Sequence, residues 1–317
     1  MKKYALIFPG QGSQYSGMGK DLYENSEAAR RVFEVADRVL CRKISDLCFN
    51  GTEEDLKQTI NSQPCILAVS LAAYEALKEK MAEKLDIVAT AGHSLGEYAA
   101  LYVSGVADLE TVFSLIQKRA SLMDEAANKT EGGMAAVLGL KKEDVIAITK
   151  DIEGVYIANF NSPEQVVITG NKDAINENCD KYKQAGAKRV LPLAVSGAFH
   201  SPLMKSAGNE FENYVTKFEI NSARIPVYTN VDAKETILKE DFIKKMPEQI
   251  YSSVQWVQTI ENMQEKGITK FIELGAGKVL AGLNKKINPE LKTYNVFDFE
   301  SLSNVAGEIL AEEKELV

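Results

Sequence analysis

The chain has 317 residues, a length that predicts two domains or one large domain with an insertion. Its 45% hydrophobic and 26% charged residues are typical of a globular protein and exclude a disordered chain or a disulfide scaffold. The 45 acidic residues outnumber the 37 basic ones, so the net charge of −8 argues against nucleic acid as a partner.

The sequence predicts neither export nor insertion into a membrane. The longest nearly apolar run, residues 65–77, contains Ser70 and Glu75 and is shorter than the roughly 20 apolar residues of a membrane span. The first apolar stretch, residues 4–8, is shorter than the about 7–15 residues of a secretory signal. The cysteines form no C-x-x-C pair, which disfavours a metal or redox motif. We therefore expect a cytoplasmic protein that contacts no membrane and holds no metal.

The first third of the chain alternates strands with helices, which predicts a parallel sheet. The apolar run at 4–8 is continuous, as in a strand buried on both faces. The predicted elements are, in chain order, a strand at 4–8, a Gly-rich loop at 9–14, helices at 26–42 and 63–85, a strand at 87–91, a tight turn at 92–96 and a helix from Glu97.

The middle of the chain has a β-α-β-β-α-β order, which is that of a ferredoxin-like unit. Its predicted elements are strands at 134–138, 155–160, 165–169 and 189–195, and helices at 142–150 and 173–185. An α/β pattern then resumes, with strands at 227–229, 271–274 and 294–296 and helices at 253–266 and 303–313. We expect an α/β fold with two parts: a large catalytic subdomain with a parallel sheet, residues 1–128 and 196–317, and a small inserted subdomain, residues 129–195.

The segment Gly92-His93-Ser94-Leu95-Gly96 matches G-x-S-x-G between a predicted strand and a predicted helix. This is the setting of a nucleophile elbow, in which glycines allow the sharp turn that exposes a serine hydroxyl. The following helix N-terminus favours developing negative charge. Ser94 is therefore the candidate nucleophile; the alternative is a Gly-rich turn whose serine only caps the helix.

A serine hydroxyl needs a base, and the chain has only two histidines, His93 and His200. His93 adjoins Ser94, and neighbouring side chains on such a turn diverge, so we expect it to have a packing and hydrogen-bonding role. His200 lies in a loop directly after a predicted strand and is the better candidate. Its alternative is a hydrogen-bonded structural histidine.

A tetrahedral intermediate needs two hydrogen-bond donors for its oxyanion. One is expected from the backbone N–H after the nucleophile, that of Leu95. The other normally comes from a loop after an earlier strand, and Gly10-Gln11-Gly12 fits that position. This loop does not match the phosphate-binding pattern G-x-x-x-x-G-K-[ST].

Four segments in this order together resemble the malonyl-CoA:acyl-carrier-protein transacylase family, whose fold also forms the acyltransferase domains of polyketide synthases. They are residues 8–14, 92–97, 197–202 and 273–278. The resemblance covers about residues 3–288. It implies an α/β-hydrolase-like large subdomain with a ferredoxin-like insert, which agrees with the pattern of elements.

The resemblance also implies site roles. Ser94 is the acylated nucleophile and His200 its base, while Gln11 and Leu95 bind substrate as the backbone oxyanion donors. It further implies that Arg119 binds the malonyl carboxylate and that the backbone carbonyl of Gln249 orients His200. Phe199 is implied to place its ring near the acyl α-carbon, a feature of related enzymes that use malonyl rather than methylmalonyl. From the residues alone, Arg119 reads as a helix-surface arginine paired with Asp124 or Glu125.

The implied reaction is a ping-pong transfer of malonyl from malonyl-CoA to the phosphopantetheine thiol of acyl carrier protein, for fatty-acid synthesis. It implies no cofactor beyond these substrates, and the family suggests a monomer. Carrier proteins are typically acidic, as is this chain, so docking requires a local basic patch. The candidates are Lys181, Lys183, Lys188, Arg189, Lys285 and Lys286, each of which is otherwise solvated surface.

Three alternatives remain. A serine hydrolase or thioesterase shares the elbow, but its histidine normally lies near the C-terminus and it has no need of Arg119. A catalytically silent carrier-binding module would have lost Ser94 or His200. A polyketide acyltransferase acting in trans has the same chemistry and a different acceptor.

Overall fold

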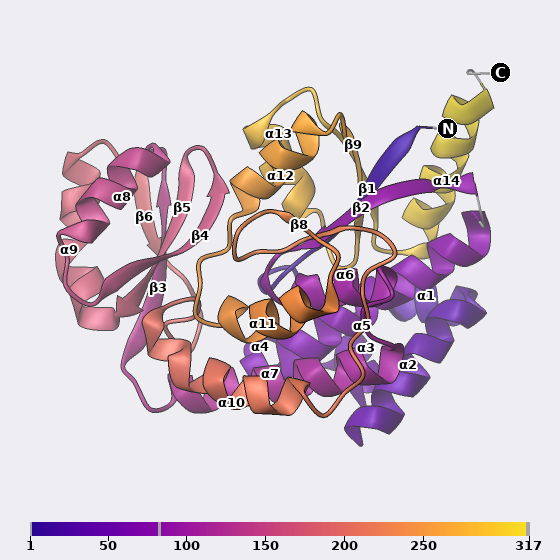
Figure 1. The fold of residues 1–317 in the computed structure, drawn as a ribbon, viewed down its shortest axis with the longest axis horizontal. Coiled ribbons are helices and arrows are strands. Elements are labelled where there is room, and N and C mark those ends of the chain that lie inside the picture. Colours follow the sequence, from indigo (N-terminus) through magenta and orange to yellow (C-terminus); the bar gives the residue numbers. More distant parts are fainter. Residues whose placement is uncertain (1, 82–83, 315–317) are drawn as a thin grey trace.

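The computed structural model describes residues 2–81 and 84–314, which form two sheets with surrounding helices (Figure 1). The strands of the larger sheet are β1 (Lys3–Phe8), β2 (Asp86–Gly92), β7 (Val227–Tyr228), β8 (Glu235–Thr236), β9 (Lys270–Leu274) and β10 (Lys292–Val296). Their spatial order is β10-β9-β1-β2-β7-β8, and all neighbours are parallel except β7 and β8. The predicted parallel sheet is confirmed.

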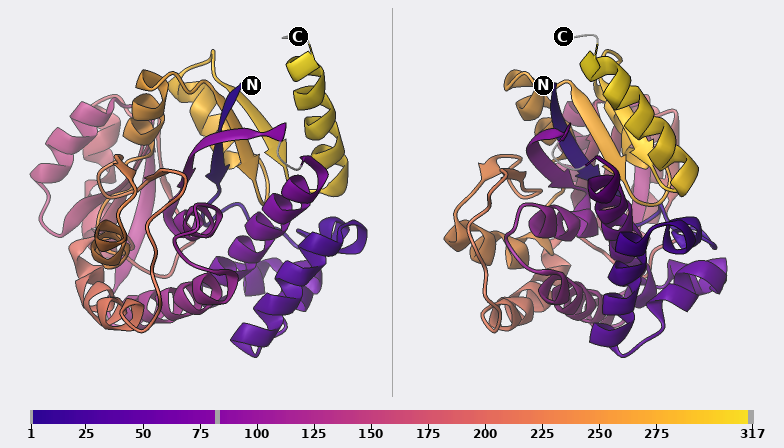
Figure 2. Two further views of the ribbon diagram at one scale, coloured as in Figure 1. Left: turned by 45° about the vertical axis from the view of Figure 1, so that its right-hand side comes forward. Right: turned by 90° about the vertical axis from the view of Figure 1, so that its right-hand side faces the viewer.

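Strand β1 separates two layers of helices. Tyr4, Leu6 and Phe8 pack into one core, and Ala5 and Ile7 into another, because successive side chains of a strand point to opposite faces. The first core includes α2 (Glu27–Leu40), α5 (Thr59–Met81), α6 (Glu97–Val103), α7 (Leu109–Ala127) and α14 (Phe299–Lys314). The second includes α12 (Trp256–Glu265) and α13 (Val279–Ile287). Figure 2 shows α14, in yellow, close to both ends of the chain.

The smaller sheet is antiparallel and lies at the left of Figure 1 with its two helices. Its elements are β3 (Gly132–Leu138), α8 (Lys142–Lys150), β4 (Val155–Ser162), β5 (Gln165–Asn171), α9 (Lys172–Gln184) and β6 (Arg189–Pro192). The strand order β4-β5-β3-β6 and the β-α-β-β-α-β succession are those of the predicted ferredoxin-like unit. The α/β fold class with this second sheet is therefore confirmed. These elements lie within residues 129–195, although the subdomain boundaries themselves stay a prediction.

Several predicted elements have different ends in the structure, among them the following three. The strand predicted to reach Val195 ends at Pro192, and the Val195 N–H donates locally to Leu193 O. The helix predicted from residue 253 begins at Trp256, because Val254 pairs with β4: its N–H donates to Ala158 O at 2.8 Å. The helix predicted at 63–85 spans Thr59–Met81, and residues 82 and 83 lie outside the described part of the chain.

Several short elements were not predicted from the sequence. They are α1 (Lys20–Asn25), α3 (Ile44–Asn50), α4 (Glu53–Lys57), α10 (Lys205–Val215), α11 (Lys239–Gln249), α13, β8 and the 3₁₀ turns η2 (Ser94–Gly96) and η3 (Pro202–Met204). The pairing of Val254 with β4 joins the smaller sheet to the rest of the chain. The loops after β1, β2 and β7 leave the same edge of the larger sheet, since these strands are parallel neighbours. The candidate site lies at this edge.

Candidate active site

Ser94 lies on a sharp turn between β2 and α6, as the elbow motif predicts. Its φ of +52° is in the left-handed region that non-glycine residues seldom adopt. The flanking glycines are required by close approach: a Cβ on Gly92 would lie 2.0 Å from the carbonyl carbon of Gly96, and one on Gly96 would lie 2.3 Å from Phe8 O. No larger residue fits at either position without moving the backbone.

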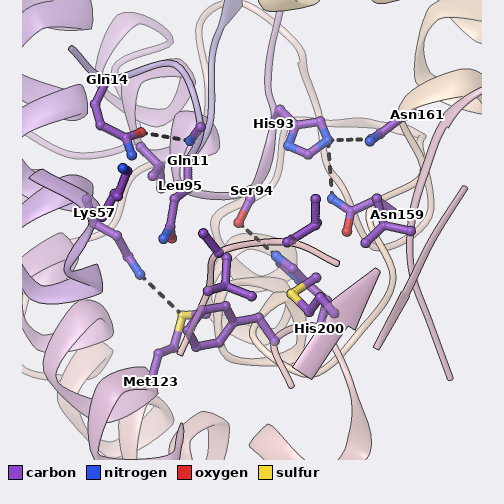
Figure 3. Close-up of a pocket in the computed structure, with 18 of the residues that line it drawn as sticks. Gln11, Gln14, Lys57, His93, Ser94, Leu95, Met123, Asn159, Asn161 and His200 are labelled. Carbon is purple, nitrogen blue, oxygen red and sulfur yellow. Dashed lines mark hydrogen bonds between the residues drawn. The ribbon is translucent and has the colours of Figure 1, made fainter. Parts of the chain in front are cut away.

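His200 faces the serine. Its Nε2 lies 2.7 Å from Ser94 Oγ (Figure 3). Its Nδ1 lies 3.0 Å from Gln249 O and 3.1 Å from Ser252 O. Two carbonyl oxygens can only accept, so Nδ1 carries the proton and Nε2 is free to accept one from the serine hydroxyl. Backbone carbonyls thus stand where a serine triad has a carboxylate.

The pKa of His200 favours the neutral imidazole. Burial lowers this pKa to about 3, and the positive charge of Arg119 and the presence of His93 act in the same direction. The carbonyls of Gln249 and Ser252 oppose the shift but do not overcome it. His200 is therefore a neutral base at pH 7, ready to receive the Ser94 proton.

His93 points away from the nucleophile (Figure 3). Its Nε2 lies 2.8 Å from Asn161 Oδ1 and 3.3 Å from Asn159 Nδ2, and its ring centroid is 5.8 Å from that of Trp256. Both asparagines belong to β4, so His93 links the elbow to the smaller sheet. This matches the packing and hydrogen-bonding role expected from the sequence.

Arg119 on α7 is completely buried, with 0% exposure. Its Nη1 donates to Gln63 Oε1 at 2.7 Å, and its Nη2 donates to Gln249 Oε1 at 3.0 Å and to Ser94 Oγ at 3.1 Å. The surface arginine that the residues alone indicated, paired with Asp124 or Glu125, is not found. Within the described chain no carboxylate forms an ion pair with Arg119.

This arrangement leaves a buried positive charge beside the nucleophile. Burial lowers the pKa of Arg119, but guanidinium is so basic that it stays charged. The nearby acid is Glu97, whose pKa burial raises to about 7. Buried charges are normally paired with an opposite charge. The site is therefore suited to a substrate that brings a carboxylate.

A cavity of about 370 Å³ opens onto Ser94, His200 and Arg119. Gln11, Leu95 and Phe199 also line it, as their expected substrate contacts require. Leu95 is in the first turn of η2, where backbone N–H groups have no partner within the helix. Phe199 is 4% exposed, and its carbonyl accepts from Thr169 Oγ1 at 2.9 Å.

Sequence reasoning missed several polar residues of this site. Gln63 accepts a hydrogen bond from Arg119, Asn161 forms one with His93, and Asn230 accepts one from the backbone N–H of Ser94. Each comes from a different part of the chain: α5, β4 and the loop after β7. No motif marks a buried amide, so their burial in the folded chain is the only signal.

The basic residues expected to dock a carrier protein differ in their partners. Lys183 forms an ion pair with Asp180 at 2.9 Å, and Lys286 donates to Gln165 Oε1 at 3.1 Å. Lys188 and Arg189 are exposed just before and at the start of β6. Among the described residues, no helix is long and apolar enough to cross a membrane, and no group of three or more His, Cys, Asp or Glu is placed to hold a metal ion.

The fold, and a serine hydroxyl 2.7 Å from a buried histidine, are those expected of an enzyme that transfers acyl groups. The acyl transferase domain family matches residues 5–293, and the chain belongs to this family. It is 43% identical to a malonyl CoA-acyl carrier protein transacylase of Bacillus subtilis, with 99% of each chain covered. It is 41% identical to one of Staphylococcus aureus, covering 97% of this chain and 98% of the relative.

Solved structures agree with the sequence relatives. An acyl carrier protein S-malonyltransferase from Vibrio cholerae superposes with a TM-score of 0.91 at 40% identity, covering 96% of this chain and 100% of that one. A structure of a type II PKS acyl-carrier protein in complex with its malonyl-transacylase gives a TM-score of 0.92 at 38% identity, covering 97% of this chain and 100% of that one. The resemblance drawn from four sequence segments is confirmed.

Proposed function

We propose that this protein transfers the malonyl group from malonyl-CoA to the phosphopantetheine thiol of acyl carrier protein, for fatty-acid synthesis, through malonyl-Ser94. The observation that carries the proposal is the Arg119 guanidinium, fully buried and 3.1 Å from Ser94 Oγ without a carboxylate partner in the described chain. The carboxylate of a malonyl group supplies the missing negative charge. A guanidinium matches it with a planar, permanently charged fork of donors.

The first half-reaction forms the acyl-enzyme. His200 Nε2 takes the hydroxyl proton of Ser94 as its Oγ attacks the thioester carbonyl of malonyl-CoA. The backbone N–H groups of Gln11 and Leu95 stabilise the oxyanion, and collapse of the intermediate breaks the carbon–sulfur bond. The CoA thiolate leaves with the proton from His200 Nε2.

The second half-reaction reverses the first. His200 takes the proton of the phosphopantetheine thiol, whose sulfur attacks the malonyl-Ser94 ester. The second tetrahedral intermediate collapses to a carrier-bound thioester, and the proton returns to Ser94. Thioester and ester interconvert without a change in oxidation state, so the proposed transfer uses no redox cofactor, and no metal is required by these steps.

Steady-state kinetics test this function. Initial rates measured while malonyl-CoA and holo-acyl carrier protein are both varied should give the parallel double-reciprocal lines of a ping-pong enzyme. Intersecting lines would contradict a malonyl-serine intermediate. Rapid release of malonate from malonyl-CoA without a thiol acceptor would instead favour the serine hydrolase alternative.

A polyketide acyltransferase acting in trans is the second candidate, favoured by the structural likeness to a transacylase bound to a type II PKS carrier. It has the same chemistry, so only the acceptor separates the two. Comparison of kcat/KM for carrier proteins of the two kinds decides between them. A cytoplasmic location and a monomeric state remain predictions from the sequence and the family.

A further inference from the structure

Asn230 holds the backbone of the nucleophile elbow from both sides of His93. Its Oδ1 accepts from Ser94 N–H at 2.7 Å, and its Nδ2 donates to Gly92 O at 2.6 Å. The two bonds fix two successive peptide units, Gly92–His93 and His93–Ser94, because each peptide bond is planar. One side-chain amide thus spans the turn that presents the serine.

The side chain of Gln249 fixes the next peptide unit. Its Nε2 donates to Ser94 O at 2.9 Å, and this carbonyl belongs to the same plane as the N–H of Leu95. The orientation of Ser94 O therefore sets the direction of the expected oxyanion donor. Together, Asn230 and Gln249 hold three consecutive peptide planes, two that lead into Ser94 and one that follows it.

The elbow needs such support because Ser94 has a φ of +52°. A non-glycine residue in this region is strained and persists only where its surroundings over-determine its conformation. Relaxation toward ordinary angles would rotate both Ser94 Oγ and the Leu95 N–H. Misplacement of reacting groups by about 1 Å can cost about a hundredfold in rate.

Asn230 is itself held in place. It is 1% exposed, its backbone N–H donates to Glu97 Oε2 at 2.6 Å, and its carbonyl accepts from Gln255 N at 3.1 Å. It follows β7, which pairs with β2 just before the elbow, at Thr90 and Ala91. The sheet therefore brings Asn230 to the elbow as a fixed group.

We propose that Asn230 is a positioning residue for acyl transfer: with the side-chain amide of Gln249, it locks the strained backbone of Ser94 and aims the hydroxyl and the Leu95 N–H at the reacting carbonyl. The proposal rests on the proposed function for the acyl group transferred. Asn230 does not line the cavity, so we expect it to act on reactivity and not on substrate affinity.

The test compares Asn230→Ala and Asn230→Asp with Asn284→Ala. Asn284 is an equally buried asparagine of the large subdomain that bonds to Trp256 Nε1 and lies outside the cavity lining. The Asp variant keeps the shape of Asn230 but cannot donate to Gly92 O. Three quantities are measured: kcat and KM for malonyl transfer, the rate at which phenylmethylsulfonyl fluoride labels Ser94, and the thermal unfolding midpoint.

Both Asn230 variants are expected to lower kcat about 30- to 100-fold, with KM for malonyl-CoA within about threefold of the wild-type value. Labelling of Ser94 should slow in parallel, whereas Asn284→Ala should keep both rates within about threefold even if its unfolding midpoint falls. Folded Asn230 variants with wild-type kcat and labelling rate would overturn the proposal. If the Ala variant does not fold, the nearly isosteric Asp variant decides.

Labelling of Ser94 distinguishes failure of the positioning role from failure of the proposed function. Sulfonyl fluoride reacts with an activated serine whatever acyl group the enzyme transfers. If the wild-type protein transfers no malonyl but the Asn230 variants still label slowly, the malonyl assignment fails and the positioning role stands. If malonyl transfer is fast in every variant, the positioning role fails and the function stands.

Discussion

Arg119 Nη2 donates a hydrogen bond to Ser94 Oγ at 3.1 Å. Arg119 lies on α7, which follows the elbow and α6 in the chain. The same serine oxygen lies 2.7 Å from His200 Nε2. Ser94 Oγ thus lies between a neutral imidazole and a cation; in the proposed mechanism the imidazole takes its proton and the cation favours negative charge on its oxygen. Under the proposed function, selectivity for a carboxylated acyl group and activation of the serine would both come from this one arrangement.

Removal of the guanidinium should destroy malonyl selectivity. A charge-assisted hydrogen bond contributes roughly 1.5–3 kcal/mol, so two to the malonyl carboxylate favour malonyl over acetyl by about a hundredfold or more. Arg119→Ala should therefore lose at least about a hundredfold in kcat/KM with malonyl-CoA and much less with acetyl-CoA. Lys118→Ala is the matched control, because Lys118 lies on the same helix as Arg119 and forms only a surface ion pair with Glu210 of α10. Equal losses with both substrates would contradict the role of Arg119.

Phe199 should exclude branched acyl groups. Phe199 lines the cavity and is 4% exposed, so we expect its ring to occupy space beside a bound acyl group. Phe199→Ser is expected to raise kcat/KM for methylmalonyl-CoA relative to malonyl-CoA by about tenfold or more, on the scale of one methyl group in a tight pocket. Phe242→Ser, in the core outside the cavity lining, should lower stability without this change. An unchanged ratio for Phe199→Ser would refute the steric role.

The rate of acylation should persist into acid. A histidine with the ordinary pKa of about 6.5 would be about 3% neutral at pH 5, and kcat/KM would fall roughly thirtyfold. Because burial lowers the pKa of His200 to about 3, we expect less than a threefold fall between pH 7 and pH 5. Any decline of the pH–rate profile with a midpoint near pH 7 is assigned to Glu97 and should be absent in Glu97→Gln. A decline in kcat/KM with a midpoint near pH 6.5 that persists in Glu97→Gln would contradict a buried neutral base.

The same shift affects folding stability in a defined direction. Between pH 6.5 and about 3 the unfolded chain binds a proton at His200 that the folded chain does not. The stability that neutral His200 contributes is therefore present above pH 6.5 and lost as the pH falls toward 3. Glu97, with its pKa raised to about 7, acts in the opposite sense: its contribution is present below about 4.5 and lost as the pH rises toward 7.

Carrier-protein docking should depend on the basic residues that lie close in sequence to the cavity lining. Lys188 and Arg189 precede Leu193, which lines the cavity, by only a few residues. Arg189→Glu is expected to raise KM for acyl carrier protein severalfold at low salt, with KM for malonyl-CoA unchanged. Lys183→Glu should have a smaller effect, because Lys183 is already paired with Asp180. If no charge reversal alters KM for carrier protein, the prediction that the carrier docks at this surface is wrong.

The sequence predicted those parts of the structure that depend on local pattern. The apolar run of β1, the elbow around Ser94 and the β-α-β-β-α-β succession each follow from neighbouring residues, and each is confirmed. Short helices such as α11 were missed, since a charged stretch with an internal Pro247 gives a weak helical signal.

The amide residues around the site could not be predicted in the same way. Gln63 and Asn230 have no neighbouring pattern that distinguishes them from solvated polar residues. Their roles arise when α5, α7 and the loop after β7 meet at one edge of the sheet. The burial of Arg119 could not be predicted either, because the pattern of a helix does not show which of its long polar side chains other elements will cover.

The most direct test of the central claim is mass spectrometry of the intact protein and of its Ser94 peptide after mixing with malonyl-CoA, followed by addition of holo-acyl carrier protein. A malonyl adduct should form on Ser94 and then move to the carrier thiol, while Ser94→Ala should give no adduct. An adduct lost to water at the same rate with and without the carrier, or one on another residue, would contradict transfer through malonyl-Ser94.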